Sequence, residues 1–269
     1  MDLARLLLVA AAALAAGLVN AVAGGGSLIS FPALVATGLP SVIANVTNTV
    51  ALCPGYFGGA YAQRRDLSGQ RRRMTTLLPV SALGGVTGAV LLLGTGEGAF
   101  EIVIPFLLLF AVALLAFQDR LRAYVARRRT AHGELWAILP VMLASVYGGY
   151  FGAALGVIVL AVLDVVIDDS LVRLNALKQM VSLTVNVSAA AVFLLSGRVD
   201  WTIALVMAIT AVFGGAIGGA IASRVPAKLL RGVVIVVGLG LSIFYFVRLT
   251  SNEARLKTTC LSAPRRPVI

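Results

Sequence analysis

The side chains best suited to holding a small charged ligand fall within one apolar stretch, residues 171–196. Asn175, Gln179 and Ser182 follow at steps of four and three residues, so they share one face of a helix, and Asn186 continues that face. Amide and hydroxyl groups spaced in this way can donate several hydrogen bonds to one anion. The Asn and Gln side chains could equally hydrogen-bond a neighbouring helix, and both interpretations stay open.

Lys178 lies beside this face, about two turns inside the apolar stretch. An ammonium group at that depth needs a compensating partner. Three interpretations stay open: it attracts a bound anion, it reaches back to the membrane interface, or it forms an ion pair. The carboxylates available for such a pair are Asp164, Asp168 and Asp169.

A second candidate site is the run Gly24, Gly25, Gly26 and Ser27, preceded by Asn20. Consecutive glycines break a helix, allow positive φ and let a ligand approach the backbone. If a half-helix begins at Ser27, with Ser27 as its cap, its free N–H groups and the positive end of its dipole favour an anion. The competing interpretation is that these glycines only allow helices to pack closely.

A second polar helix is expected over residues 41–62. Asn45 and Asn48 are three residues apart with Thr47 between them, and all three join the candidate binding residues. Interhelical hydrogen bonding is the alternative role for these side chains too.

Three carboxylates stand at the ends of apolar segments, namely Asp66, Asp164 and Asp200. Asp66 and Asp200 each follow an Arg, so a local ion pair or a helix cap is the default interpretation, with gating or proton coupling as the alternative. Asp164 is the best single candidate for proton coupling. We expect no metal site and no cofactor, because the sequence has no His/Cys/carboxylate cluster, phosphate-binding loop or Ser/His/Asp set.

The composition sets these residues in a membrane protein. Of 269 residues, 59% are hydrophobic and 12% charged, and the mean hydropathy is +0.98. A soluble domain has about 25% charged residues, so a soluble globular protein is excluded. An all-α polytopic membrane protein is predicted, because backbone groups in lipid must be satisfied within each segment. The eight apolar segments are approximately 3–39, 41–62, 75–94, 99–118, 135–163, 171–196, 201–222 and 229–247.

The net charge of +11 comes from Arg clusters between these segments. Basic residues at 63–74 and 119–134 mark cytoplasmic loops of an inner-membrane protein. A nucleic-acid-binding surface is excluded, because it would need aromatic residues between the basic ones for base stacking. With eight crossings, both termini are cytoplasmic. The basic tail 248–269 contains Pro264 and Pro267 and is expected to be poorly ordered.

The two halves of the chain resemble each other. The first repeat covers 1–118, a basic loop covers 119–134 and the second repeat covers 135–247. Pairs 131 residues apart are Gly17 and Gly148, Gly25 and Gly156, and Val50 and Val181; Gly84, Gly85 and Gly88 recur as Gly214, Gly215 and Gly218. The first segment of each half is broken at glycines. Eight full crossings give parallel repeats of four segments, whereas re-entrant broken segments give inverted repeats of three, and binding sites of such transporters lie where the interrupted segments meet.

Residues 17–27, GLVNAVAGGGS, followed by Pro32 and by ANVTN at 44–48, resemble the TauE/SafE family of membrane proteins. The second-half block GRVDW at 197–201, leading to GGAIGG at 214–219, resembles it too, and the resemblance covers roughly residues 5–247. It implies a bacterial inner-membrane permease that exports sulfite, sulfoacetate or related sulfur-containing anions. Where many members repeat the glycine-rich signature, the second half here reads GAALG at 152–156, so we expect two chemically unequal half-sites.

Two functional hypotheses follow. The first is a secondary transporter that moves a small anion, a sulfite or sulfonate, outward across the bilayer, with no nucleic-acid partner and with a homo-oligomer left open. The second is a non-transporting membrane enzyme or assembly factor. An enzyme would need titratable or metal-binding residues at one depth, and these are scarce in the apolar segments.

Overall fold

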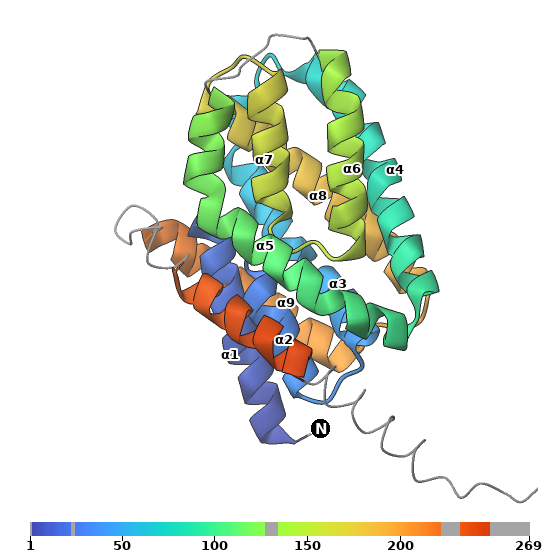
Figure 1. The fold of residues 1–269 in the computed structure, drawn as a ribbon. Coiled ribbons are helices and arrows are strands. Elements are labelled where there is room, and N and C mark those ends of the chain that lie inside the picture. Colours follow the sequence, from blue (N-terminus) through green and yellow to red (C-terminus); the bar gives the residue numbers. More distant parts are fainter. Residues whose placement is uncertain (1, 23–24, 127–133, 222–231, 248–269) are drawn as a thin grey trace, which may run out of the picture.

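The computed structural model describes residues 2–22, 25–126, 134–221 and 232–247, and every regular element within these ranges is a helix (Figure 1). The helices are α1 Leu3–Val22, α2 Ser27–Ala36, α3 Ser41–Ala62, η1 Arg64–Leu67, α4 Arg71–Thr95, α5 Glu97–Ala126, η2 Glu134–Ala137, α6 Ile138–Tyr150, α7 Leu155–Val166, α8 Leu171–Leu195, α9 Trp201–Ile221 and a last apolar helix Gly232–Val247. The expected basic tail, 248–269, and residues 127–133 of the expected loop lie outside the described residues.

Five described helices are long and apolar enough to cross a membrane: α1, α4, α5, α8 and α9. The prediction of an all-α protein is thereby confirmed within the described part of the chain, and the apolar helices agree with a polytopic membrane protein. α3 has 22 residues but is more polar, and the shorter apolar helices include α2 with 10 residues, α6 with 13 and α7 with 12. The first apolar segment divides into α1 and the short α2, and the fifth divides into α6 and α7.

The first apolar segment is broken as predicted. α1 ends at Val22 and α2 begins at Ser27, with Gly25 at a φ of 90°. The expectation that Ser27 caps α2 was wrong, because Gly26 occupies the N-cap position and Ser27 is the first helical residue. A β-carbon on Gly26 would collide with the Ala16 carbonyl oxygen. Gly26 thus lies beside a residue six positions before the end of α1, and α2 packs back along α1.

The fifth apolar segment is broken in the same manner. α6 ends at Tyr150 and α7 begins at Leu155, with Gly152 at a φ of 74° and Ala154 at 59°. The Tyr147 hydroxyl donates a hydrogen bond of 2.7 Å to the Ala153 carbonyl, which holds this connection against α6. In Figure 1, α6 and α7 stand side by side and are joined at their lower ends, in the middle of the molecule.

Glycines allow two helix pairs to approach until their backbones touch. α1 packs along α9, and α4 packs along α6. The close pairs are Gly17 with Ala211, Gly214 with Leu14, Gly218 with Leu18, Gly84 with Ser145, Gly88 with Val146, and Gly149 with Gly85. Small residues at helix interfaces favour such packing within a membrane. For these glycines, close packing is therefore the role that the structure shows.

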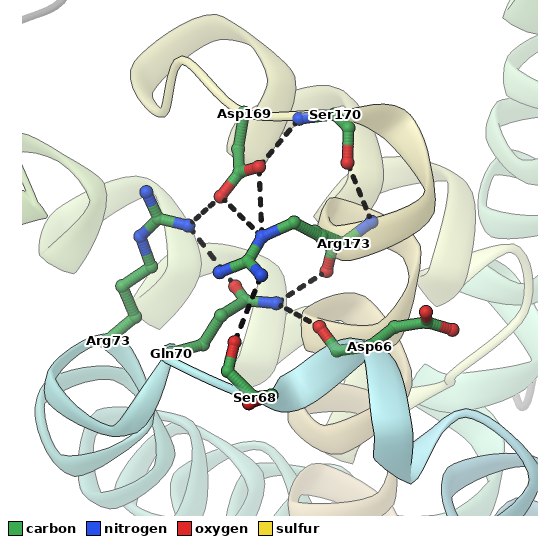
Figure 2. A network of polar contacts seen from close by, with 7 residues as sticks. All are labelled: Asp66, Ser68, Gln70, Arg73, Asp169, Ser170 and Arg173. Atoms are coloured by element: carbon green, nitrogen blue, oxygen red, sulfur yellow. Dashed lines mark hydrogen bonds and ion pairs between the residues drawn. The ribbon is translucent and has the colours of Figure 1, made fainter.

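A polar network ties η1 and the start of α4 to the start of α8 (Figure 2). The Asp169 carboxylate accepts hydrogen bonds from Arg73, from Arg173 Nε at 3.1 Å and from the Ser170 N–H at 2.7 Å. Gln70 Nε2 donates to the carbonyl oxygens of Arg173 and Asp66. We call the part of the molecule formed by residues 63–73 and 166–173 the basic end; it lies at the top of Figure 1.

Burial opposes ionisation of Asp169, but the hydrogen bonds from Arg73, the Ser170 N–H and Arg173 outweigh it. They lower the pKa of the carboxyl from 3.8 to about 2.

The opposite end of the molecule carries its own contact, since Glu97 at the start of α5 accepts a 2.9 Å hydrogen bond from the Val42 N–H of α3.

Candidate functional site

A small polar cavity lies where the two helix breaks meet α8. Its volume is about 30 Å³, enough for roughly two water molecules. Six of the predicted binding residues line it, namely Asn20, Gly25, Ser27, Lys178, Gln179 and Ser182. We call this the central cavity. The structure thus brings together the glycine run of the first segment and the polar face of α8, which are more than 140 residues apart in the sequence.

The backbone supplies positive potential to the central cavity from two directions. Ser27 is the first residue of α2 and Leu155 the first of α7, and both line the cavity. The helix dipole places partial positive charge at each start. The N–H groups of Leu28, Ile29, Leu155 and Val157 already bond carbonyl oxygens within these turns, so the starts contribute mainly through this charge. Two helix starts that face one cavity form an environment in which an anion is stabilised.

Strained backbone accompanies this geometry. Ala154 is the one non-glycine residue with positive φ in the described chain, and it is buried at 2% exposure. An alanine in the left-handed region costs free energy and persists only where the surroundings fix it. Here it turns the chain into α7 so that the start of that helix reaches the cavity.

Ser182 provides the most direct indication of a ligand. Its side chain is 1% exposed, it lines the central cavity, and its Oγ has no hydrogen-bond partner among the residues that the structure describes. A buried hydroxyl without a partner costs about 1–3 kcal/mol. Ser182 therefore presents to the cavity a donor and acceptor that a bound molecule would satisfy.

Lys178 and the amides complete the polar lining. The Lys178 side chain passes over Gly156, the second residue of α7. Asn20 and Tyr56 also line the cavity. Among the described residues, the lining contains one cation, Lys178, and no carboxylate. Its composition of ammonium, amide, hydroxyl and helix starts is suited to a small anion rather than to a cation.

The other predicted binding residues bridge helices. Asn45 Nδ2 donates 2.9 Å to the Tyr150 carbonyl, and Asn48 Oδ1 accepts 2.6 Å from Ser30 Oγ. Thr47 Oγ1 accepts 3.1 Å from the Asp200 N–H, and Asn175 Nδ2 donates 2.8 Å to Gln63 Oε1. For these four residues the structure shows interhelical hydrogen bonds, the alternative left open by the sequence. Gly26 packs against Ala16, and Gly24 lies outside the described residues.

The three carboxylates occupy different environments. Asp200 caps α9, since its Oδ1 accepts a 3.0 Å hydrogen bond from the Ile203 N–H, as its default interpretation predicted. Asp66 lies in η1 at the basic end and lines a pocket there. Asp164 is buried at 2% exposure within α7, more than two turns from the start of that helix.

Five residues of the cavity wall were missing from the predicted site, namely Tyr56, Gly152, Ala154, Leu155 and Gly156. The sequence held a signal for the four residues of the second break, because Gly156 follows Gly25 at the 131-residue offset of the two repeats. Tyr56 had no such signal, since it reaches the cavity only because α3 packs along α8. Among the described residues, no group of three or more His, Cys, Asp or Glu is placed to hold a metal ion.

Comparison with known proteins gives one family match and several relatives. A family model described as "Sulfite exporter TauE/SafE" matches residues 9–245. The chain is 26% identical over 221 residues to a "Probable membrane transporter protein" of Haemophilus influenzae, covering 82% of this chain and 86% of that one. It is 24% identical over 232 residues to "Probable membrane transporter protein YfcA" of Escherichia coli K12, covering 86% and 85%. It is 28% identical over 237 residues to "Probable membrane transporter protein ORF9" of Sinorhizobium sp, covering 86% and 88%. No solved structure gives a significant match.

Proposed function

The chain belongs to the TauE/SafE family of membrane transporters, and from this premise we propose that it is a permease that binds one small anion in the central cavity. The proposed substrate is sulfite or a related sulfur-containing anion, moved outward across the bacterial inner membrane. The description of the matching family as a sulfite exporter suggests this chemical class.

The observation that carries the proposal is the unpartnered Ser182 hydroxyl at the meeting point of two helix starts. A buried orphan hydroxyl is destabilising unless something fills its hydrogen-bonding capacity. An oxyanion would accept hydrogen bonds from Ser182 and from an amide, and the starts of α2 and α7 would add positive potential. The Lys178 ammonium, near the start of α7, would add charge attraction and further donors.

The size of the central cavity favours a compact anion. A volume of about 30 Å³ leaves room for few non-hydrogen atoms. Sulfite therefore suits the cavity better than a sulfonate with a bulky organic group. A larger substrate would require the two broken segments or Gln179 to move apart.

We further propose that the two halves are inverted repeats with re-entrant first segments. The contacts support this, because Gly214 meets Leu14 just as Gly84 meets Ser145, at offsets of 130 and 131 residues. Since α2 returns along α1 and α7 along α6, each broken segment would enter and leave the membrane on one side. Six crossings then replace the eight expected from the sequence. With the basic end in the cytoplasm, the N-terminus would lie on the opposite face, in contrast to the expectation from charge alone.

Anion binding is tested by thermal unfolding of the purified protein in detergent. Sulfite should raise the melting temperature in a saturable manner, because a ligand that binds only the folded state stabilises it by RT ln(1 + [L]/Kd). Chloride and a bulky sulfonate at equal ionic strength serve as controls. Equal shifts with all anions, or no shift with sulfite, would contradict the proposal.

A further inference from the structure

Two further pockets continue from the central cavity toward the basic end. The first has a volume of about 430 Å³ and lies among α1, α3, α8 and α9. We call it the vestibule; its wall includes Asn20, Gly55, Gly58, Gly59, Gln63 and Gln179. The second, of about 350 Å³, is lined by Gln63, Asp66, Asn175 and apolar residues. We call it the outer pocket.

Shared residues show how these spaces adjoin. Asn20 and Gln179 line both the central cavity and the vestibule, so these two side chains stand between them. Gln63 lines both the vestibule and the outer pocket, so it stands between those two. The three spaces therefore form a series from the middle of the molecule to the basic end, separated at two places by side-chain amides.

The Gln179 side chain lies against Gly59 at the boundary between the central cavity and the vestibule. A β-carbon at Gly59 would collide with Gln179 Nε2, so the absence of a side chain at 59 gives the amide its place. Gln179 is half-buried and belongs to α8, and a rotation about its side-chain bonds would open the central cavity to the vestibule. Polar amides at this point would also offer hydrogen bonds to a passing anion.

A hydrogen bond between two side chains lies at the boundary between the vestibule and the outer pocket. Asn175 Nδ2 of α8 donates 2.8 Å to Gln63 Oε1, which follows the end of α3. The bond joins the two helices that flank the series of pockets. Its net contribution is small enough for thermal opening, since losing one neutral hydrogen bond shifts an equilibrium by only about three- to tenfold.

We propose that the anion path of this protein runs from the central cavity through the vestibule to the outer pocket at the basic end. Gln179 is its inner barrier, and the Gln63–Asn175 pair is its outer barrier. This inference rests on the permease function proposed above. With the basic end in the cytoplasm, as proposed above, this path admits the anion from the cytoplasmic side.

The test is thiol labelling of the vestibule with a sulfonate-bearing, membrane-impermeant methanethiosulfonate reagent. The background carries Cys53→Ala and Cys260→Ser. Gly58→Cys places the thiol in the vestibule wall, where a β-carbon meets nothing within 4 Å. The matched control, Gly94→Cys on α4, is equally uncrowded and lies outside the vestibule.

The reagent is added to either face of sealed vesicles. We expect the thiol at 58 to react only from the face that carries the basic end. Gln63→Ala should raise its rate roughly three- to tenfold, the factor expected from losing one hydrogen bond, and leave the rate at 94 unchanged. Reaction from the other face, reaction from neither face, or a rate at 58 insensitive to Gln63→Ala would overturn the path.

Failure of the path and failure of the permease function remain distinguishable. Because Gln63 lies outside the central cavity, sulfite should still raise the melting temperature of Gln63→Ala. If sulfite stabilises the protein but labelling contradicts the path, the binding site stands and the path falls. If sulfite stabilises neither protein, the proposed function falls as well.

Discussion

Lys178 of α8 lies across the start of α7: a β-carbon at Gly156 would be 3.7 Å from Lys178 Cδ and 3.9 Å from its Nζ. A cation at a helix start meets the positive end of the helix dipole, which is unfavourable without a compensating negative group. This position places the Lys178 side chain in the wall of the central cavity, beside the first turn of α7. Three features of that wall lead to separate predictions.

Replacing Lys178 with Met removes the charge and keeps a long apolar stem. If the ammonium holds the anion, sulfite affinity should fall about 10- to 100-fold, as loss of a charge-assisted hydrogen bond predicts. Lys178→Arg should also bind weakly, because a planar guanidinium seldom replaces a compact ammonium in a tight site. Arg120→Met, at an exposed cation on α5, is the control. Unchanged sulfite affinity in Lys178→Met would remove this residue from the site.

Ser182→Ala should separate binding from stability. Removing a buried hydroxyl that has no partner should leave the melting temperature of the ligand-free protein unchanged or higher, while sulfite stabilisation weakens. Ser81→Ala is the matched control, because Ser81 is also fully buried but its Oγ donates 2.7 Å to the Leu77 carbonyl. A Ser182→Ala protein that binds sulfite as tightly as the parent would refute the role of this hydroxyl.

Gly25→Val tests the first helix break. Valine at a φ of 90° is strained by about 1–3 kcal/mol, and its β-carbon would lie 2.9 Å from Leu115 Cδ1. Gly38→Val is the matched control, since Gly38 has a similar φ of 91° but open space around its β-carbon position. Both variants should lose stability, and only Gly25→Val should lose transport after normal insertion. Normal flux in Gly25→Val would show that the break serves packing alone.

The Asp169 network should make the stability of the fold depend on pH in the acid range. Its folded pKa of about 2 lies below the ordinary 3.8, so its stabilisation is complete above pH 3.8 and is lost as the pH falls through 2. That difference corresponds to roughly 2 kcal/mol. Asp169→Asn should therefore lower the melting temperature at neutral pH, and the gap to the parent should narrow in acid. Asp66→Asn is the control, because only the Asp66 backbone carbonyl joins the network (Figure 2). A gap that stays constant with pH would contradict the account.

Much of the fold could be predicted from the sequence because its signals are local. The glycine run at 24–26 and the glycines near 152 mark the two breaks, and positive φ at Gly25 and Gly152 explains why glycine is needed there. The polar face of α8 was predicted as well, and Gln179 and Ser182 of that face reach the central cavity.

The remaining site depended on contacts between distant segments. Asn45, Asn48 and Thr47 have the same side-chain chemistry as the cavity residues, but they bond Tyr150, Ser30 and Asp200. Nothing in the spacing along α3 reveals those partners. Periodicity places a residue on a helix face, whereas only the packing of helices decides whether that face meets another helix or a cavity.

The most direct test of the central claim is sulfite flux in proteoliposomes with imposed proton gradients. The account predicts saturable flux in the parent and in Ser81→Ala, and flux reduced at least tenfold in Lys178→Met, whose protein remains folded and correctly inserted. A dependence on the proton gradient would identify the coupling ion. Absence of flux in the parent, or equal flux in Lys178→Met, would contradict the account.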